Sequence, residues 1–391
     1  MGLLRMKILH IISSGGMYGA EAVILNLSRT LNEAGHSSML GVFANAKNLN
    51  LQLHETAIAE GIESHIIPCS GQFDRAAMAK LRELVIQTNA DIVHAHGFKA
   101  DIYSFLALNN FSIPLVSTCH NWTDTDLAVS IYGKIDRFVL RKYASVIAVS
   151  DAVKNRLVKA GVHDEKIHLI KNGIDIRPFQ KASPSLRGIV DKEGAPIVGF
   201  VGRLSKEKGA DVFLRVASRV LEEIPDAKFV LVGEGPERNE LELLVDQLAI
   251  GKSTFLVGRR TDMPSVYASF DLMVLSSRDE GLPMAVLEGM ASGVPWVAAA
   301  VGDVPKIIQH QASGLLVPPG DVDSLADGVI GLLRNITERQ RLGEGGRRRV
   351  QEEFSAERMS SSYLGIYQRA LANKDSKKRE NKHFVSPGNA K

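Results

Sequence analysis

The sequence predicts an α/β protein built from two doubly wound parallel sheets. Short runs rich in Val, Ile and Leu recur along most of the chain, and segments with helical periodicity separate them. These runs do not alternate with polar residues, which is typical of parallel strands covered by helices on both faces. The runs fall into two series, and 391 residues are more than one compact core usually holds. We therefore expect two similar domains made of βα units.

The predicted strands follow from these apolar runs. The first series comprises residues 7–12, 37–43, 64–68, 91–96, 114–120 and 145–150, and the second comprises residues 196–202, 228–233, 253–258, 272–277 and 295–300. The opening run has basic residues beside it, as a signal peptide would. However, it is short, lacks a small-residue cleavage site and passes directly into a Gly-rich turn. We interpret it as the first strand.

A polar and weakly periodic stretch, Phe179 to Pro196, divides the two series and reads as an interdomain linker. We assign residues 1–180 to an N-terminal domain, 181–196 to the linker and 197–354 to a C-terminal domain. A helix at about 355–373 completes the first domain, and residues 374–391 form a basic, disordered tail. Ligands of open α/β sheets bind beyond the carboxyl ends of the strands, so two facing sheets would border a central cleft.

Composition and charge narrow the functional classes. Hydrophobic residues make up 45% and charged residues 23%, as in an ordinary soluble protein. The tail from Lys374 has a net charge of +4, and the total of +3 therefore leaves −1 for the remainder. This distribution predicts no nucleic-acid-binding face. The tail is either a solvated terminus or a contact for anionic lipid.

The expected environment is the cytoplasm. Two cysteines, Cys69 and Cys119, cannot form a disulfide framework and suit a reducing compartment. No segment reaches the roughly 18 to 20 apolar residues that span a bilayer. We expect a soluble protein, or one that binds peripherally to the cytoplasmic face of a membrane.

The segment "GFVGRLSKEKG" carries two cations at the end of a predicted strand. Arg203 and Lys208 follow the strand and precede a helix that begins near Ala210. Cations beside a helix N-terminus make an anion site, in which Arg offers a planar fork to phosphate and Lys a point charge. Taken alone, the segment is equally typical of a solvated basic loop.

The segment "SSRDEGLPMAVLEGM" places two carboxylates at the start of a helix. Glu280 precedes this helix, and Glu288 lies about one turn inside it. No Ser, Thr or Asp caps the helix, so its first backbone amides are open to a phosphate. Those amides belong to Met284, Ala285 and Val286. Carboxylates suit sugar hydroxyls because they accept hydrogen bonds.

Three other motifs are less convincing. The loop "SSGGMYGAE" lets backbone approach a ligand, but it lacks the order G-x-G-x-x-G and the later acid of an NAD site. Cys119 and His120 are adjacent on a strand, so they point to opposite faces and are poorly placed as a nucleophile–base pair. His94 and His96 share a strand face as metal ligands might, but no third ligand with recognisable spacing follows. We predict that His94 packs and that His96 lines the cleft.

Together these motifs resemble the retaining glycosyltransferases of family 4, which have the GT-B fold of two Rossmann-like domains. The resemblance rests on the Gly-Gly loop, the strand-end His120, "GRLSKEKG", "GEGP" and the E-x7-E segment from Glu280 to Glu288. It covers about residues 6–372. One position departs from the pattern, because Lys306 stands in "VGDVPK" where many relatives have Glu.

The resemblance implies a role for each candidate residue. Arg203 and Lys208 would hold the donor diphosphate, and Glu288 would hold the ribose hydroxyls. Glu280 and the amides of Met284, Ala285 and Val286 would bind the donor sugar. Gly16 and His120 would reach the phosphate or sugar from the first domain. The loop around Arg260 would contact the base.

The expected reaction is retaining transfer of a sugar from a nucleoside-diphosphate sugar to a hydroxyl of a glycan or lipid-linked acceptor. Such a reaction serves cell-surface polysaccharide, lipopolysaccharide or glycolipid synthesis. The resemblance implies no cofactor and no divalent metal, and "DTD", residues 124–126, is interpreted as chance or as an acceptor contact. The alternatives are a sugar-nucleotide epimerase or hydrolase, and a non-catalytic nucleotide-sugar-binding subunit.

A basic segment, "IYGKIDRFVLRKYA", offers a second surface hypothesis. Lys134, Arg137, Arg141 and Lys142 recur at helical spacing with apolar residues between them. Such a helix either lies on an anionic membrane or packs on the core with a solvated basic face.

Overall fold

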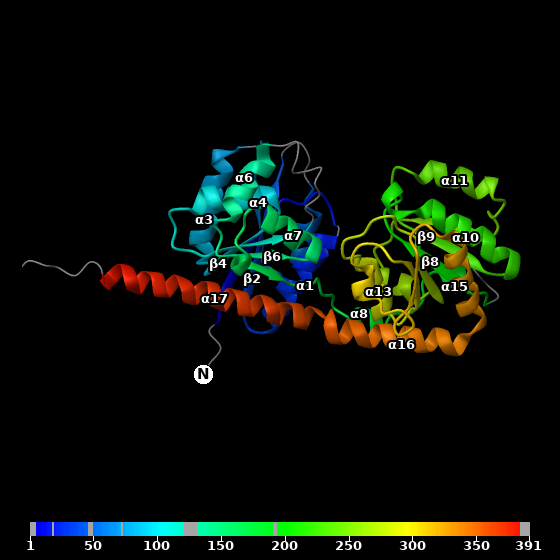
Figure 1. The fold of residues 1–391 in the computed structure, drawn as a ribbon. Helices are drawn as coiled ribbons and strands as arrows, with labels where there is room; N and C mark the ends of the chain where they lie inside the picture. The colour runs from blue at the N-terminus through cyan, green and yellow to red at the C-terminus, as the bar shows by residue number, and fades with distance from the viewer. Residues whose placement is uncertain are drawn as a thin grey trace, which may run out of the picture. The chain divides into compact units, whose positions relative to one another are not determined.

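The chain folds into two compact units, each with one parallel sheet. The computed structural model describes residues 5–17, 19–45, 50–71, 73–120, 131–190 and 194–383. The first unit comprises residues 1–173 and 356–391, and the second comprises residues 174–355. Helices flank the sheet in each unit (Figure 1). Among the described residues, no helix is both long and apolar enough to span a bilayer.

The first unit alternates strands with helices. Its strands are β1 (Lys7–Ile12), β2 (Ser37–Ala44), β3 (Ser64–Pro68), β4 (Ile92–His96), β5 (Leu115–Cys119), β6 (Ser145–Ala148) and β7 (Ile167–Leu169). Its helices are α1 (Gly19–Glu33), α2 (Gln52–Ala59), α3 (Arg75–Thr88), α4 (Phe98–Leu108), α6 (Ile131–Leu140), α7 (Asp151–Lys159) and α17 (Ala356–His383), with a short 3-10 turn η1 (Asp164–Lys166).

The strand order of the first sheet is β3-β2-β1-β4-β5-β6-β7, and every pair is parallel. Alternate residues of each strand enter two separate cores. Leu9 and Ile11 of β1 join the core beneath α3, α4 and α7, whereas Ile12 joins the core beneath α1 and α2. Burial on both faces explains why these strands are apolar throughout.

The second unit has the same plan. Its strands are β8 (Ile197–Val201), β9 (Lys228–Val232), β10 (Thr254–Gly258), β11 (Leu272–Leu275), β12 (Trp296–Ala299) and β13 (Leu315–Val317). Its helices are α8 (Arg177–Gln180), α9 (Arg187–Val190), α10 (Ala210–Glu223), α11 (Arg238–Gln247), α12 (Met263–Tyr267), α13 (Met284–Ala291), α14 (Val304–Ile307), α15 (Val322–Arg334) and α16 (Ile336–Glu353), with a 3-10 turn η2 (Lys206–Lys208).

The second sheet has the order β10-β9-β8-β11-β12-β13. The sheet order therefore reverses between β8 and β11, as it does between β1 and β4 in the first unit. In open α/β sheets this switch point opens a crevice at the carboxyl ends of the two strands. The predicted fold class, two doubly wound parallel-sheet units, is confirmed.

All eleven predicted strands are present, and the described residues contain two more. The additional strands, β7 and β13, have three residues each and lie at the outer edge of their sheets. Three residues are too few to show a recognisable pattern in the sequence. Their pairing with β6 and β12 makes them strands.

The boundary between the units differs from the predicted linker. The second unit begins at Ile174, and the segment 181–196 belongs to that unit. Leu186 is fully buried, and its backbone N–H donates to Ser269 Oγ at 3.0 Å. Arg187 forms an ion pair with Asp271 at 2.7 Å. The stretch is polar in composition, but a few apolar side chains suffice to pack it against the second core.

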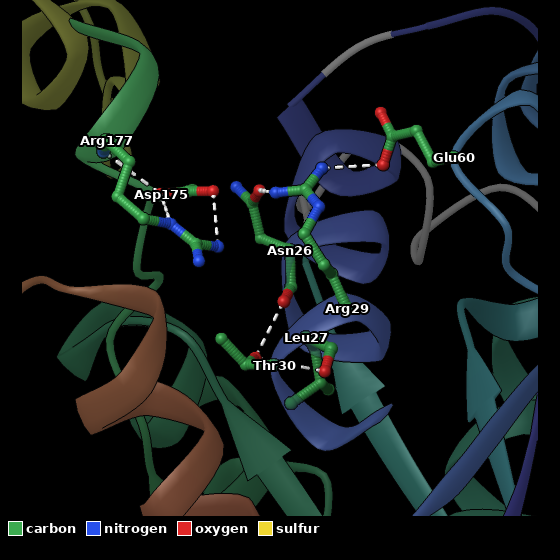
Figure 2. A network of polar contacts seen from close by, with 7 residues as sticks. All are labelled: Asn26, Leu27, Arg29, Thr30, Glu60, Asp175 and Arg177. Carbon is green, nitrogen blue, oxygen red and sulfur yellow. Dashed lines mark hydrogen bonds and ion pairs between the residues drawn. The ribbon is translucent and has the colours of Figure 1, made fainter. Parts of the chain in front are cut away.

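Figure 2 shows two local polar networks, each within its own unit. In the second unit, the guanidinium of Arg177 bonds both carboxylate oxygens of Asp175 at 2.8 Å. In the first unit, Arg29 of α1 bonds Glu60, which ends α2, at 2.6 Å. Two nitrogens matched to two oxygens make the Asp175–Arg177 pair geometrically specific.

The last helix extends beyond its predicted end. Helix α17 begins at Ala356 and continues to His383, so it includes ten residues of the segment predicted to be a disordered tail. Residues 374–383 are rich in Lys, Arg and Glu and contain neither Gly nor Pro. Such residues favour the helix, and extending a helix that already exists avoids the cost of nucleation. Residues 384–391 lie outside the described part.

Candidate active site

The switch point of the second sheet brings the two predicted motifs together. The loop after β8 carries Arg203 and Lys208, and the loop after β11 carries Glu280. Lys208 Nζ lies 2.8 Å from each carboxylate oxygen of Glu280. Ser277 Oγ donates to Glu280 Oε1, also at 2.8 Å. The topology thus joins residues that are 72 positions apart in the chain.

This cluster is largely withdrawn from water. The Glu280 side chain is 6% exposed and that of Lys208 is 30% exposed. Removing one member would leave the other charge partly buried without its partner, which costs more than a surface pair would. Lys208 is therefore the more accessible member of the pair for an anionic ligand.

Close backbone contacts hold these loops in place. Gly209 has φ +66°, and a Cβ there would lie 2.1 Å from the carbonyl oxygen of Ser276. Gly302, after β12, has φ +49°, and its Cβ would lie 1.7 Å from the carbonyl oxygen of Glu280. Any larger residue would force the loops apart, so glycine is required at both positions.

Arg278 adds a polar link between the same two loops. Its backbone N–H donates to Glu207 O at 2.8 Å, and its guanidinium donates to Lys206 O at 2.7 Å. The guanidinium also pairs with Asp211 in the first turn of α10. Arg278 therefore has a structural role.

Arg203 is placed differently from Lys208. It follows β8 and is exposed. Within the described part of the chain, its guanidinium takes part in no ion pair, although its charge lowers the pKa of Glu207 together with stronger hydrogen bonds to that carboxylate. Its five N–H donors are thus available to a ligand.

Helix α13 begins without a side-chain cap, as predicted. Pro283 occupies the N-cap position, and no side chain bonds the first amides. The N–H of Val286 donates to Pro283 O at 3.1 Å. Met284 and Ala285 are therefore the amides for which the described residues supply no acceptor. An open helix start suits an anion or a sugar oxygen.

Glu288 lies inside α13 with one hydrogen-bond donor. The hydroxyl of Tyr267 donates to Glu288 Oε2 at 2.8 Å. Burial raises the pKa of the Glu288 carboxyl to about 7, although the Tyr267 hydrogen bond acts in the opposite direction. Such a carboxyl can accept hydrogen bonds from ligand hydroxyls, and those bonds would favour its ionised form.

The loop after β10 contains Arg260. Its guanidinium bonds both oxygens of Asp262 at 2.8 Å, and this pairing lowers the pKa of the Asp262 carboxyl. The side chain is thus occupied, which leaves the backbone of this loop for the base contact that the family resemblance implies.

Lys306, the departure from the family pattern, has a local partner. Its ammonium lies 2.6 Å from Asp303 Oδ1, and the Asp303 side chain is 10% exposed. Both residues belong to the loop and first turn after β12, next to Gly302 and hence to the backbone of Glu280. The chain therefore presents a cation paired with an acid where the family resemblance implies an acid.

In the first unit, the Gly-rich loop follows β1 at that sheet's own switch point. Ser14 Oγ bonds both Gly16 O and Glu21 Oε1 of α1 at 2.8 Å. Gly16 has φ +156°. The loop is therefore held by side chains, with its glycine backbone in a conformation that few other residues adopt.

The strand-end histidines form a cluster that is larger than predicted. His94 and His96 share one face of β4, and His10 of β1 joins them, because His10 is in register with His94. Burial lowers the pKa of His10 to about 3 and that of His120 to about 4. Burial and neighbouring histidines hold the pKa values of His94 and His96 well below the usual range.

The contacts of the two strand histidines refine the prediction for each. His94 Nδ1 bonds Tyr367 of α17 and His94 Nε2 bonds Thr118, both at 2.8 Å. His94 therefore packs, as predicted. His96 is 5% exposed and bonds two other histidines, so the prediction that it lines a cleft is wrong.

Cys119 is not part of this cluster. It is buried in the core beneath α4, on the sheet face opposite to His94. Burial raises the pKa of its thiol well above the usual range. A thiol that resists ionisation is a poor nucleophile, in agreement with the sequence interpretation.

The basic segment between β5 and β6, residues 131–144, is only partly helical. Helix α6 ends at Leu140, so Arg141 and Lys142 lie beyond it. The guanidinium of Arg141 donates to Ala160 O at 2.7 Å. Val139 and Leu140 are buried. Val139 and Leu140 therefore pack within the unit, whereas Phe138 is exposed. The side chain of Lys134 and the "DTD" residues 124–126 lie outside the described residues.

Three residues of these clusters were not predicted from the sequence. Tyr267 bonds Glu288, Ser277 bonds Glu280 and His10 bonds His96. Ser277 had a signal, since it stands three residues before Glu280 on the same loop. His10 could have been found by aligning β1 with β4 through their apolar runs. Tyr267 carries no such local signal.

Comparisons with known proteins agree with this geometry. A model described as Glycosyltransferase Family 4 matches residues 17–177, and a model described as Glycosyl transferases group 1 matches residues 184–349. The chain belongs to the group 1 glycosyltransferases of family 4. It is thus a transferase, and the membership of family 4 that its motifs suggested is confirmed.

Two curated relatives illustrate the range of this family. The glycosyltransferase is 29% identical over 372 residues to N-acetyl-alpha-D-glucosaminyl L-malate synthase from Bacillus anthracis, a match covering 91% of this chain and 94% of the relative. It is 27% identical to a UDP-Gal:alpha-D-GlcNAc-diphosphoundecaprenol alpha-1,3-galactosyltransferase from Escherichia coli, over 66% of this chain and 70% of the relative.

Solved structures support the fold. Anabaena HepE in complex with UDP superposes with a TM-score of 0.80 at 22% identity, covering 93% of the glycosyltransferase and all of HepE. HepE in complex with UDP-glucose gives 0.76 at 23% identity, covering 95% of this chain. At this identity the likeness establishes the GT-B type of fold.

Proposed function

We propose that the glycosyltransferase moves a sugar from a nucleoside-diphosphate sugar to a hydroxyl of a glycan or lipid-linked acceptor, with retention of configuration. The observation that carries the proposal is the contact of Lys208 with Glu280 at the switch point of the second sheet, beside the open start of α13. A cation, a sugar-binding carboxylate and uncapped amides are what a diphosphate sugar requires.

The second unit supplies the donor contacts in this proposal. Arg203 and Lys208 bind the diphosphate, and the Met284 and Ala285 amides bind a phosphate or sugar oxygen. Glu280 accepts hydrogen bonds from the donor sugar and Glu288 from the ribose. Similar proteins support a nucleotide sugar as the donor, since one is named for a UDP-galactose donor and HepE has been crystallised with UDP-glucose.

The chemistry follows from where charge develops. The bond between the anomeric carbon and the diphosphate oxygen breaks, and negative charge builds up on that oxygen. In this proposal Arg203, Lys208 and the helix amides surround that oxygen and stabilise its developing charge as cations and donors held by the fold. The acceptor oxygen bonds to the anomeric carbon on the same face, and its proton passes to the departing phosphate. No metal or cofactor takes part in the proposed reaction.

The first unit supplies the remaining contacts. Gly16 reaches the phosphate or sugar through its backbone, and His120 contacts the transferred sugar. The acceptor belongs to cell-surface polysaccharide, lipopolysaccharide or glycolipid synthesis. The E. coli relative, which is named for a diphosphoundecaprenol-linked acceptor, supports the lipid-linked class.

The primary test is a thermal-shift screen in the presence of EDTA against nucleoside diphosphates and their sugars. We expect selective stabilisation by one nucleotide sugar, and loss of that stabilisation in Arg203→Ala. Arg215→Ala, which removes an exposed arginine from α10, is the matched control and should retain it. No stabilisation by any of these compounds would contradict the assignment of the donor site.

Product analysis with the stabilising sugar then separates the rival activities. A transferase gives a new glycoside only when an acceptor hydroxyl is supplied. An epimerase would convert the nucleotide sugar without an acceptor, and a hydrolase would release free sugar at full rate. A subunit without catalytic activity would bind the donor and leave it intact.

Peripheral binding to the cytoplasmic face of a membrane is a further part of the proposal. Phe138 of α6 is 56% exposed, and Lys142 lies 5.8 Å from its ring. Liposome flotation of a variant with Lys134, Arg137, Arg141 and Lys142 neutralised tests this surface. Weaker binding to anionic vesicles would support it, and unchanged binding would reject it.

A further inference from the structure

Three histidines of the first unit form a continuous hydrogen-bonded chain, which we call the histidine chain: His10, His96 and His120. His10 Nδ1 lies 3.0 Å from His96 Nε2, and His96 Nδ1 lies 3.1 Å from His120 Nε2. The three residues come from β1, from the end of β4 and from the position just after β5. The histidine chain therefore runs across three neighbouring strands toward their carboxyl ends.

The geometry of the rings shows well-aligned hydrogen bonds. The ring centres are 5.2 Å apart for His10 and His96, and 5.3 Å apart for His96 and His120, with interplanar angles of 27° and 24°. Such separations arise when the two bonded nitrogens lie on the line that joins the ring centres. The nitrogens thus point directly at each other and share a proton, which leaves no space for a metal ion between them.

Counting protons shows what this arrangement does. A neutral imidazole carries one N–H donor and one acceptor nitrogen. In a chain of three, all N–H groups must therefore point in the same direction. Either every Nδ1 carries the proton, or every Nε2 does. The state of one histidine is thereby fixed by the other two.

The surroundings keep the histidine chain neutral. Burial holds the pKa of each member far below neutrality. The neighbouring His94 is engaged at both nitrogens with Tyr367 and Thr118, and Thr118 in turn bonds Tyr363. Among the described residues, these hydrogen-bonding neighbours are neutral groups, and none of them supplies a carboxylate that would stabilise an imidazolium ion.

The two ends of the histidine chain are not equivalent. His10 Nε2 and His120 Nδ1 are both buried and have no hydrogen-bond partner among the described residues. One of these nitrogens must carry a proton. His10 is fully buried in the middle of β1, whereas His120 lies at a strand end and is partly exposed as a residue, although its Nδ1 atom is itself covered. A ligand that moves aside what covers Nδ1 can supply the missing acceptor at this end. An unpaired buried N–H is costly, so a ligand at His120 favours the proton on Nδ1.

We propose that His10 and His96 are positioning residues that fix the tautomer of His120, so that His120 Nδ1–H donates a hydrogen bond to a hydroxyl oxygen of the transferred sugar. This inference rests on the proposed function, because it takes His120 as a substrate contact. His10 Nδ1–H donates to His96 Nε2, and His96 Nδ1–H donates to His120 Nε2. His120 is then presented as a pure donor at Nδ1, although it stays uncharged.

The test is a direct measurement of tautomers by NMR on the full chain labelled with 15N-histidine. Two-bond 1H–15N correlations distinguish an imidazole protonated at Nδ1 from one protonated at Nε2, the form that predominates for free histidine in water. We expect Nδ1–H at His10, His96 and His120 when the donor sugar nucleotide found by the thermal-shift screen is bound. His120 protonated at Nε2 in that complex would overturn the proposal.

Two variants at His10 extend the test to a residue that does not touch the ligand. His10→Leu removes the donor to His96 and should shift His120 toward the Nε2–H form. His10→Asn retains an amide N–H near the Nδ1 position and should restore the wild-type tautomer. Identical His120 tautomers in the wild-type protein and in His10→Leu would overturn the proposal.

Kinetics provide a second readout. We expect His10→Leu to lower kcat about tenfold with little change in KM for the donor, and His10→Asn to remain within about twofold of wild type, since catalytic hydrogen bonds depend on correct geometry. Equal losses in both variants would indicate a packing role only and would overturn the proposal. If His10→Leu does not fold, the tautomers of the wild-type complex decide.

The two proposals fail in different ways. Were the protein to bind a sugar nucleotide without transferring sugar, the transferase mechanism would fail while the tautomers of the complex could still be read. Were no sugar nucleotide to bind, UDP and free sugars would serve as probes, and the absence of any Nδ1–H signal at His120 would overturn the positioning role by itself.

Discussion

The two units share one strand order but place different chemistry at their switch points. Near β8 and β11 the second unit gathers charges, namely Lys208 with Glu280 and the exposed Arg203. Near β1 and β4 the first unit gathers neutral imidazoles, His10, His94 and His96, whose pKa values are all lowered by burial. The same fold thus places partly exposed charges, which suit an anionic diphosphate, at one switch point and buried neutral imidazoles at the other. Topology determines where a site forms, and side chains determine what it binds.

Removing the ammonium group should have the largest effect on function. Lys208→Ala should lower kcat about 10²- to 10³-fold, because a fixed cation no longer meets the leaving diphosphate. Lys206→Ala, which removes an exposed lysine two residues earlier, should leave kcat nearly unchanged. The comparison is made in a transfer assay with the donor found by the thermal-shift screen. Near-normal turnover in Lys208→Ala would remove that residue from the diphosphate role.

Separating the two loops of the second unit should cost the most stability. Gly209→Ala places a Cβ 2.1 Å from Ser276 O at φ +66°, so we expect a loss of about 3 kcal/mol in the free energy of unfolding. Gly331→Ala is the control of opposite sign. Its Cβ meets nothing within 4 Å in the exposed part of α15, so it should stabilise by about 0.5–1 kcal/mol. Equal stabilities of the two variants would contradict the loop contact.

We expect ionised Glu288 to lower the stability of the unliganded protein and to strengthen nucleotide binding. Its pKa rises from 4.5 to about 7 on folding, so the folded state retains a proton that the unfolded state releases. The stabilisation of the folded state by this retained proton is fully present below pH 4.5 and is lost as pH rises through 7. Without ligand, Glu288→Gln should therefore be more stable than wild type at pH 8, by up to about 3 kcal/mol, and the difference should vanish near pH 4.

The same variant should bind nucleotide less well. Glu288→Gln should weaken UDP binding about tenfold at pH 8, because a neutral amide accepts ribose hydroxyls less strongly than a carboxylate does. Calorimetry at pH 8 and chemical unfolding from pH 4 to 8 provide the two measurements. Glu240→Gln, at an exposed position of α11, is the control for both. If Glu288→Gln is no more stable than wild type at pH 8, burial does not disfavour the ionised form of Glu288.

Removing a single buried hydrogen bond in the first unit should lower stability less than separating the two loops of the second unit. Tyr367→Phe removes the hydroxyl that bonds His94 Nδ1 at 2.8 Å and leaves a buried nitrogen unpaired. We expect a loss of about 1–2 kcal/mol in the free energy of unfolding, with little effect on donor binding. Gln368→Ala, at the adjacent exposed position of α17, should be neutral. A large loss of donor affinity in Tyr367→Phe would contradict the view that the donor is bound mainly by the charged groups of the second unit.

The sequence predicted more about the second unit's site than about the first unit's. "GRLSKEKG" and the E-x7-E segment lie within single loops and helix starts, so their spacing alone suggested a common ligand. The histidine chain instead joins residues from three strands, with His10 and His96 separated by 86 positions. Only the register of β1 and β4 brings these residues into contact. A pattern within one strand could show that His94 and His96 share a face, but not that His10 completes the group.

The sequence by itself determined the fold class, the eleven longer strands and the family, because apolar periodicity and loop motifs are local properties of the chain. The tertiary structure decided which distant side chains meet, such as Tyr267 with Glu288, and where the units divide. It also decided which histidines are neutral, because a pKa depends on burial and on neighbours brought from other strands. Long-range packing creates these properties, and no local pattern in the sequence encodes them.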